Sequence, residues 1–263
     1  MLVDLPLILV AVTVLLYARG ARRMRRMEGW RVGAFAAALV SLVLALEPPL
    51  DSQVGRHLWA HMTQHVLLMA VVAPLVVLGA PWMQIWRGLP LDLRRPIART
   101  VLGSRWWAPV RGLCRLLARP TMAFALFNAD IGLWHVPRMY DLTLHNQGIH
   151  DLEHVSFLLL GVLFWAQVAD SPPFHARLDL PQRVGFIVLG AAASWVLAVV
   201  LALARTPIYP AYARGRGGLN PLADQQLAAG VMWGLGSIPF AIGIFVLLYR
   251  WLTPHVRAQP AHT

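Results

Sequence analysis

Long apolar runs alternate along the chain with shorter gaps rich in arginine and proline. An apolar run of about 20 residues is long enough to cross the hydrocarbon core of a membrane as a helix. The pattern predicts an all-α fold, a polytopic transmembrane helical bundle that forms one integral-membrane domain over residues 1–263. The seven expected spans cover about residues 3–18, 32–46, 58–78, 121–139, 149–168, 184–204 and 225–252.

Composition and the placement of charge support a membrane location. Hydrophobic residues make up 58% of the chain and charged residues only 13%, and all the basic residues are arginine. The arginines crowd into alternate gaps, which by the positive-inside rule places the N-terminus outside and the C-terminus in the cytoplasm. The net charge of +11 therefore indicates contact with membrane lipid and not binding of nucleic acid. The gap at residues 82–119 is also rich in tryptophan and is expected to lie along the cytoplasmic interface as an amphipathic segment.

Two histidine pairs share one spacing near the outer ends of two expected spans. His61 and His65 lie near the start of the third span, and His150 and His154 near the start of the fifth. Residues four apart lie on one helix face, one turn from each other. A histidine in a span is costly and usually functional, and imidazole suits zinc, copper, iron and nickel. We predict that the four histidines surround one metal site in the outer half of the membrane.

Other polar and sulfur-containing side chains are candidates around these histidines. Asp224, near the start of the seventh span, is expected as a further metal ligand or as a hydrogen-bond partner of one. His135, Glu153, Met232 and Asp130 are additional candidates for either role. A thioether would favour Cu(I), and an aspartate inside a span is a functional residue by default. No residue is predicted to be catalytic.

These polar residues fall within short motifs that recur in a known family. The motifs are His61-Met62-Thr63-Gln64-His65 with Ala73-Pro74 and Leu78-Gly79-Ala80-Pro81-Trp82, then Trp134-His135-Val136-Pro137 with Tyr140-Asp141, then His150-Asp151-Leu152-Glu153-His154 with Phe164-Trp165, and Asp224-Gln225-Gln226 with Gly230 and Met232-Trp233. In this order, over roughly residues 55–235, they resemble the multi-spanning cytochrome c oxidase assembly factor family CtaG, named for caa3-type oxidases.

The resemblance implies a multi-pass protein of the bacterial plasma membrane that is not an enzyme. Such a protein would handle copper for a haem–copper cytochrome c oxidase, whose subunits would be its partners. Copper is the expected metal, with zinc or iron as alternatives. The chain has a single cysteine, Cys114, so a copper chaperone mechanism that needs a cysteine pair is not available to it.

Two other functions fit the histidine pairs. The stretch from His150 to His154 has the His-x-x-Glu-His spacing of some zinc peptidases, with Glu153 as the base, and paired histidine motifs also suit di-iron enzymes. A copper permease is the second alternative, for which polar groups would be needed through the full thickness of the membrane. The sequence carries no sign of the oligomeric state.

Overall fold

The computed structural model describes residues 5–213 and 218–253. These residues form helices joined by turns, apart from one isolated antiparallel bridge between Ser171 and Phe174. The helices in the first half of the chain are α1 (Leu5–Ala21), α2 (Gly29–Leu46), α3 (Asp51–Val54), α4 (Leu58–Val66), η1 (Leu67–Val72), α5 (Ala73–Gly79), α6 (Trp82–Gly88), α7 (Leu91–Ala98), η2 (Arg99–Gly103), η3 (Arg105–Trp107) and α8 (Ala108–Leu117). Those in the second half are α9 (Pro120–Trp134), α10 (Pro137–His145), α11 (Gln147–Val168), α12 (Leu180–Leu203), α13 (Pro221–Gly230), η4 (Val231–Leu235) and α14 (Gly236–Leu252). The expected all-helical fold is therefore confirmed for the described residues.

Within the described residues, five helical segments are long and apolar enough to cross a membrane. They are Gly29–Val54, Leu58–Gly79, Gln147–Val168, Leu180–Leu203 and Pro221–Leu252. The other two expected spans are also helices, but α1 has 17 residues and α9 has 15. At 1.5 Å per residue, a helix of 15 residues covers only about 22 Å of a hydrocarbon core that is about 30 Å thick. The number of seven spans and the orientation of the termini consequently stay predictions.

The expected fourth span, 121–139, ends earlier than the apolar pattern indicated. α9 stops at Trp134, and a new helix, α10, begins at Pro137. Proline has no backbone N–H, and its ring disfavours helical geometry at the preceding residue, which here is Val136. Val136 adopts an extended conformation, so the chain turns between the two helices and places His135 at the bend.

Two of the long segments contain a π-helical turn shortly before a proline. η1 is followed by Pro74, and η4 is followed by Pro239. A proline ring clashes with the carbonyl four residues earlier and removes one helical hydrogen bond, so widening of the preceding turn relieves the clash. Such turns are frequent at functional sites. Here η1 follows the first histidine pair, and η4 contains Met232.

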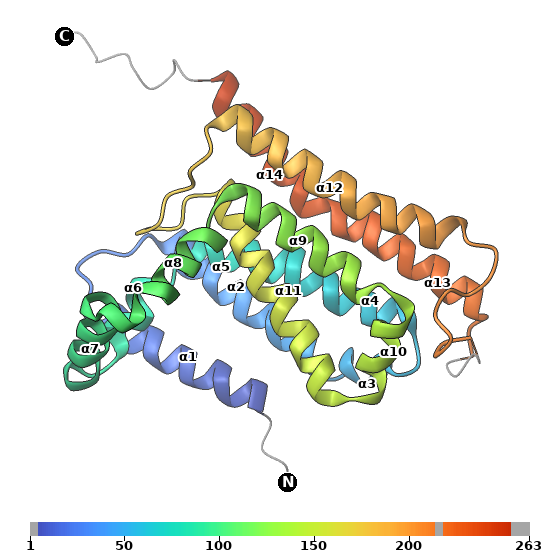
Figure 1. Cartoon of the computed structure of the whole chain (residues 1–263), viewed down its shortest axis with the longest axis horizontal. Helices are drawn as coiled ribbons and strands as arrows, with labels where there is room; N and C mark the ends of the chain where they lie inside the picture. Colours follow the sequence, from blue (N-terminus) through green and yellow to red (C-terminus); the bar gives the residue numbers. More distant parts are fainter. Residues whose placement is uncertain (1–4, 214–217, 254–263) are drawn as a thin grey trace.

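The segment 82–119 is divided into several short helices. α6 packs closely against α1, where glycines allow the two backbones to touch. A Cβ atom at Gly88 would lie only 2.1 Å from the carbonyl oxygen of Leu16. In Figure 1, α1, α6 and α7 lie together at one end of the molecule, while α12 and α14 run side by side along another face.

The largest apolar core lies between the central helices and the pair α12 and α14. Phe127 of α9 stacks on Phe164 of α11, with ring centroids 4.2 Å apart, and Phe186 of α12 lies 4.7 Å from Phe164. Phe240 of α14 packs against Trp165 at 5.1 Å. These aromatic contacts hold α9, α11, α12 and α14 in fixed register, and α11 also carries His150, Glu153 and His154.

Candidate metal centre

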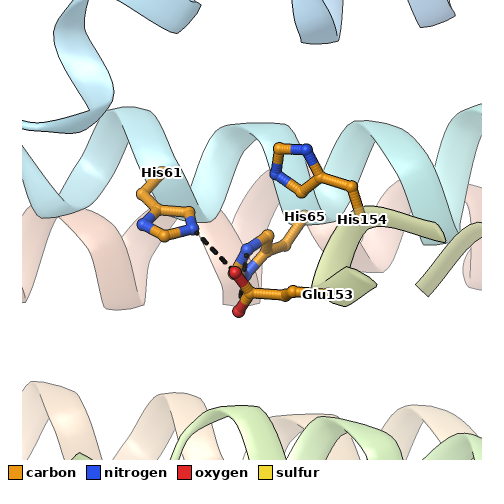
Figure 2. Close-up of side chains that lie close together, drawn as sticks. All are labelled: His61, His65, Glu153 and His154. Carbon is orange, nitrogen blue, oxygen red and sulfur yellow. Dashed lines mark hydrogen bonds and ion pairs between the residues drawn. The ribbon is translucent and has the colours of Figure 1, made fainter. Parts of the chain in front are cut away.

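The two histidine pairs meet where α4 packs near the start of α11. His61, His65, His154 and Glu153 each offer one ligand atom, and these atoms all lie within 4.8 Å of one another. Glu153 is central, since its two carboxylate oxygens lie 3.3 Å from Nε2 of His61 and 3.4 Å from Nε2 of His65. Figure 2 shows both contacts as dashed lines, with His61 and His65 on one helix and Glu153 and His154 on the other. We call these four residues the His/Glu cluster.

His150 lies beside the His/Glu cluster without belonging to the tightest group. Its ring centroid is 4.1 Å from that of His154 and 5.0 Å from that of His61. The structure thus brings all four predicted histidines together and adds Glu153 at their centre. Glu153 contacts two imidazoles directly, which makes it a candidate ligand.

Burial and missing hydrogen bonds suit this centre to a metal ion. His61 and Glu153 are fully buried, and His65 is 3% exposed. Both ring nitrogens of His65, Nε2 of His154 and Nε2 of His150 are buried without a hydrogen-bond partner, as is Oε1 of Glu153. Buried polar atoms are normally paired, and an unpaired cluster of this kind points to an ion.

The spacing of the donors also fits metal coordination. Nitrogen and oxygen ligands lie about 2.0–2.2 Å from a tetrahedral ion, so neighbouring ligand atoms are separated by about 3.3 Å. The distances of 3.3 and 3.4 Å from Glu153 to the two histidines match this value. Imidazole and carboxylate donors can hold zinc, copper or iron.

A chain of tyrosine hydroxyls orients His61 from behind. Nδ1 of His61 lies 2.7 Å from the hydroxyl of Tyr140, which donates to the hydroxyl of Tyr212 at 3.4 Å. Tyr212 in turn donates to the carbonyl of Val54 at 2.6 Å, and a carbonyl can only accept. In this arrangement Nδ1 of His61 carries the proton, and Nε2 presents its lone pair to the cluster. Histidines that bind metals are usually held in this way by a partner on the other ring nitrogen.

The two tyrosines were missed by reasoning from the sequence. Tyr140 stands in one of the motifs that carry the family resemblance, but no role followed from its spacing. Tyr212 lies in the loop before α13, where nothing in the local pattern links it to His61. A buried hydroxyl needs a partner, but sequence alone cannot say which helix supplies it.

His135 and Met232 lie next to the His/Glu cluster and share a small pocket with His65. The pocket is lined by residues of α4, η1, α9, α12, η4 and α14. His135 is 6.0 Å from His65 between ring centroids, and its Nε2 lies 3.3 Å from Sδ of Met62. His135 and Met232 therefore lie close to the cluster. Among the described residues, neither forms a hydrogen bond or ion pair with Glu153.

Asp130 and Asp224 are buried, but they lie outside the His/Glu cluster. Oδ1 of Asp130 accepts from Nε1 of Trp134 and from the hydroxyl of Ser156, each at 2.9 Å. Both oxygens of Asp224 accept backbone N–H groups, from Leu58 at 2.8 Å and from Trp59 at 3.1 Å. These two N–H groups are free because they begin α4, so Asp224 caps the helix that carries His61 and His65. The aspartate supports the site through the position of that helix.

The architecture defines a class of protein: a helical membrane protein with a buried centre of histidines and one carboxylate near the ends of its central helices. The particular family follows from comparison with known sequences. Residues 15–253 match the family described as cytochrome c oxidase caa3 assembly factor (Caa3_CtaG), and the chain belongs to this family. The resemblance of the motifs is thus confirmed over nearly the whole chain.

The curated relatives are longer proteins from mycobacteria. Uncharacterized proteins of Mycobacterium bovis and Mycobacterium tuberculosis are each 26% identical over 247 residues, which is 89% of this chain and 36% of the relative. One from Mycobacterium leprae is 24% identical over 245 residues, covering 89% of this chain and 37% of the relative. The chain therefore spans about a third of the length of these relatives. No solved structure matches the chain.

The family is described by its role in the assembly of a caa3-type cytochrome c oxidase. The five apolar helices of membrane-spanning length found among residues 5–213 and 218–253 agree with a membrane protein.

Proposed function

We propose that this assembly factor binds copper at the His/Glu cluster and delivers it to a haem–copper oxidase in the bacterial plasma membrane. The observation that carries the proposal is the convergence of His61, His65, His154 and Glu153 within 4.8 Å, with ring nitrogens of His65 and His154 buried without a hydrogen-bond partner. His150 stands close enough to enter the coordination when an ion is bound. Copper is the cargo, and zinc or iron are the alternatives that the same donors would accept.

The position of the centre supports exchange with a partner in the membrane. It lies near the start of α4 and α11, and each of these helices follows a short turn. With the seven-span arrangement and the N-terminus outside, these helix starts face the outer side of the membrane. Copper would then enter from the outer side and leave toward an oxidase subunit in the same bilayer.

Metal analysis of the purified protein tests the proposal directly. The wild type is compared with a double variant, His65→Ala with His154→Ala, and with His145→Ala, because His145 is exposed at the end of α10. We expect the full copper content in the wild type and in the His145 variant and a lower copper content in the double variant, together with loss of oxidase assembly in cells. Unchanged copper content and unchanged assembly in the double variant would show that the proposal is wrong.

Glu153→Gln distinguishes metal delivery from hydrolysis. As a ligand, the carboxylate strengthens binding, so the amide variant should bind copper more weakly and support less oxidase assembly. A zinc hydrolase with Glu153 as its base would instead keep the metal and lose its activity. Full metal content combined with lost function would therefore favour the enzyme.

A further inference from the structure

A small pocket between the central helices is lined by an unusual set of side chains. Three methionines, Met62, Met69 and Met232, share it with His65 and His135, and its volume is about 40 Å³. The remaining lining is mostly apolar and includes Val66, Phe127, Ile131 and Phe240. The residues come from segments far apart in the chain, so the fold, and not local sequence, gathers the sulfur atoms.

The contact between His135 and Met62 lacks the proton that a hydrogen bond would need. Nδ1 of His135 lies 2.7 Å from the carbonyl oxygen of Ile131, which can only accept, so Nδ1 carries the proton. In the neutral ring Nε2 then has a free lone pair, and it lies 3.3 Å from Sδ of Met62, which has no hydrogen to donate. A doubly protonated ring would place a charge among apolar side chains, which is costly. Two electron-pair donors thus face each other inside the protein.

The separation of these two atoms is the one that a shared metal ion would require. With metal–nitrogen and metal–sulfur distances of about 2.0 and 2.3 Å, a nitrogen 3.3 Å from a sulfur subtends an angle of about 100° at the metal. That angle is close to tetrahedral, so neither side chain needs to move far. Met232 lines the same pocket and offers a second thioether.

Other occupants fit the pocket less well. A volume of about 40 Å³ holds an ion or a water molecule and is far below the roughly 300 Å³ of a typical organic ligand site. A buried water needs two to four polar partners; it could pair with His65 or Ser194, but it would leave the thioethers, which are weak acceptors, without use. Thioether and imidazole donors in apolar surroundings select the soft ion Cu(I) over harder divalent ions.

We propose a second metal site in this pocket, in which Nε2 of His135 and the thioethers of Met62 and Met232 bind Cu(I). His65 lines the pocket and also belongs to the His/Glu cluster, so the two sites are adjacent. The second site extends the copper handling proposed above, but binding of Cu(I) in it does not require the His/Glu cluster to be filled. Zinc should load the cluster alone, because zinc gains little from thioethers.

X-ray absorption on the full-length protein in detergent, loaded anaerobically with Cu(I), tests this site. We expect sulfur among the atoms bound to copper in the wild type. A double variant, Met62→Leu with Met232→Leu, keeps apolar volume and should lose the sulfur signal and bind Cu(I) at least about tenfold more weakly, a difference of about 1.4 kcal/mol. Met122→Leu serves as the control, because Met122 lies on α9, the helix that ends just before His135, but is 38% exposed.

Zinc binding separates this site from the His/Glu cluster. The methionine double variant should bind zinc as the wild type does, whereas Glu153→Gln should weaken zinc binding and leave copper bound to sulfur. A wild-type Cu(I) spectrum with nitrogen and oxygen ligands only would overturn the second site, even if a variant failed to fold. Unchanged Cu(I) affinity in the folded double variant would overturn it as well, and neither result would bear on the cluster.

Discussion

The central helices carry two buried regions of opposite character. Around Phe164 the side chains are aromatic and interlock with Phe127, Phe186 and Phe240, leaving no polar atom to satisfy. Around Glu153 the side chains are equally buried, but several of their nitrogen and oxygen atoms have no partner. α11 supplies residues to both regions, about three turns apart.

The aromatic region stabilises the fold, whereas the polar region costs folding stability and is held in place by the rest of the fold. Close aromatic packing lowers the free energy of the folded state, whereas burial of unpaired polar atoms raises it. The His/Glu cluster is therefore held in place by its surroundings until an ion satisfies it. Changes in the aromatic region should mainly reduce folding stability, and changes in the polar region should mainly reduce metal binding.

The largest expected effect is the loss of stability in Phe164→Ala. The ring is fully buried, and Gly190 leaves room for it, since a Cβ there would lie 2.5 Å from the ring. Removing it should cost about 3–5 kcal/mol of folding stability, measured by thermal unfolding in detergent. Leu159→Ala on the same helix is the control, because Leu159 is 58% exposed. The copper content per folded chain should stay at the wild-type value, and a specific loss of copper would mean that the two regions are coupled.

The sequence predicted which residues meet in the polar region better than it predicted the role of each one. The i,i+4 spacing placed His61 with His65 and His150 with His154 on common helix faces, and the structure brings these faces together. Spacing could not assign a central place to Glu153, because that depends on how α11 is rotated against α4. That rotation is set by side-chain packing along the whole length of the helices, which no local pattern encodes.

The second largest effect concerns a residue that supports the polar region from outside. Asp224 accepts the first backbone N–H groups of α4, so Asp224→Ala should cost about 1–2 kcal/mol of stability, as loss of a helix cap does. The copper content of the folded protein should remain unchanged. Asp179→Ala is the matched control, because Asp179 caps α12 through the amide of Gln182. Loss of copper in the Asp224 variant alone would assign Asp224 as a ligand.

Helix ends were harder to predict than helix centres for a related reason. The apolar pattern runs through residues 121–139, but the backbone changes direction at Val136-Pro137. The cap on α4 comes from a residue 166 positions later in the chain. Both features depend on single residues whose effects are steric or long-range, whereas the spans follow from the sum of many apolar side chains.

Removal of one hydroxyl behind the cluster should lower metal affinity, with little effect on stability. In Tyr140→Phe the ring stays, but Nδ1 of His61 loses its partner at 2.7 Å. Loss of such a partner typically weakens metal binding about tenfold to a hundredfold, measured by competition with a copper chelator. Tyr249→Phe is the control, since Tyr249 is 62% exposed. Equal affinity in the two variants would show that the tyrosine chain does not orient His61.

The smallest effect is expected at a partly solvent-exposed ion pair just beyond the C-terminal end of α11. Asp170 lies 3.3 Å from Arg183 and accepts from the amide of Ala176. Burial alone would raise the pKa of Asp170, but the Ala176 amide and the Arg183 guanidinium outweigh burial and hold that pKa below its ordinary value. The charged form therefore stabilises the fold above the pKa of the unfolded carboxyl, and this contribution disappears as the pH falls through the folded value.

Asp170→Asn should accordingly lower the unfolding temperature at neutral pH by an amount worth at most about 1 kcal/mol, because the pair is partly exposed. The difference between the variant and the wild type should shrink in acid, while Asp92→Asn, at an exposed position of α7, should change little at either pH. A difference that persisted in acid would assign the effect to packing and not to charge. At the exposed ion pair, water can satisfy the polar atoms, so the contact contributes little to stability. In the buried His/Glu cluster the unpaired nitrogen and oxygen atoms need a metal ion for the same purpose.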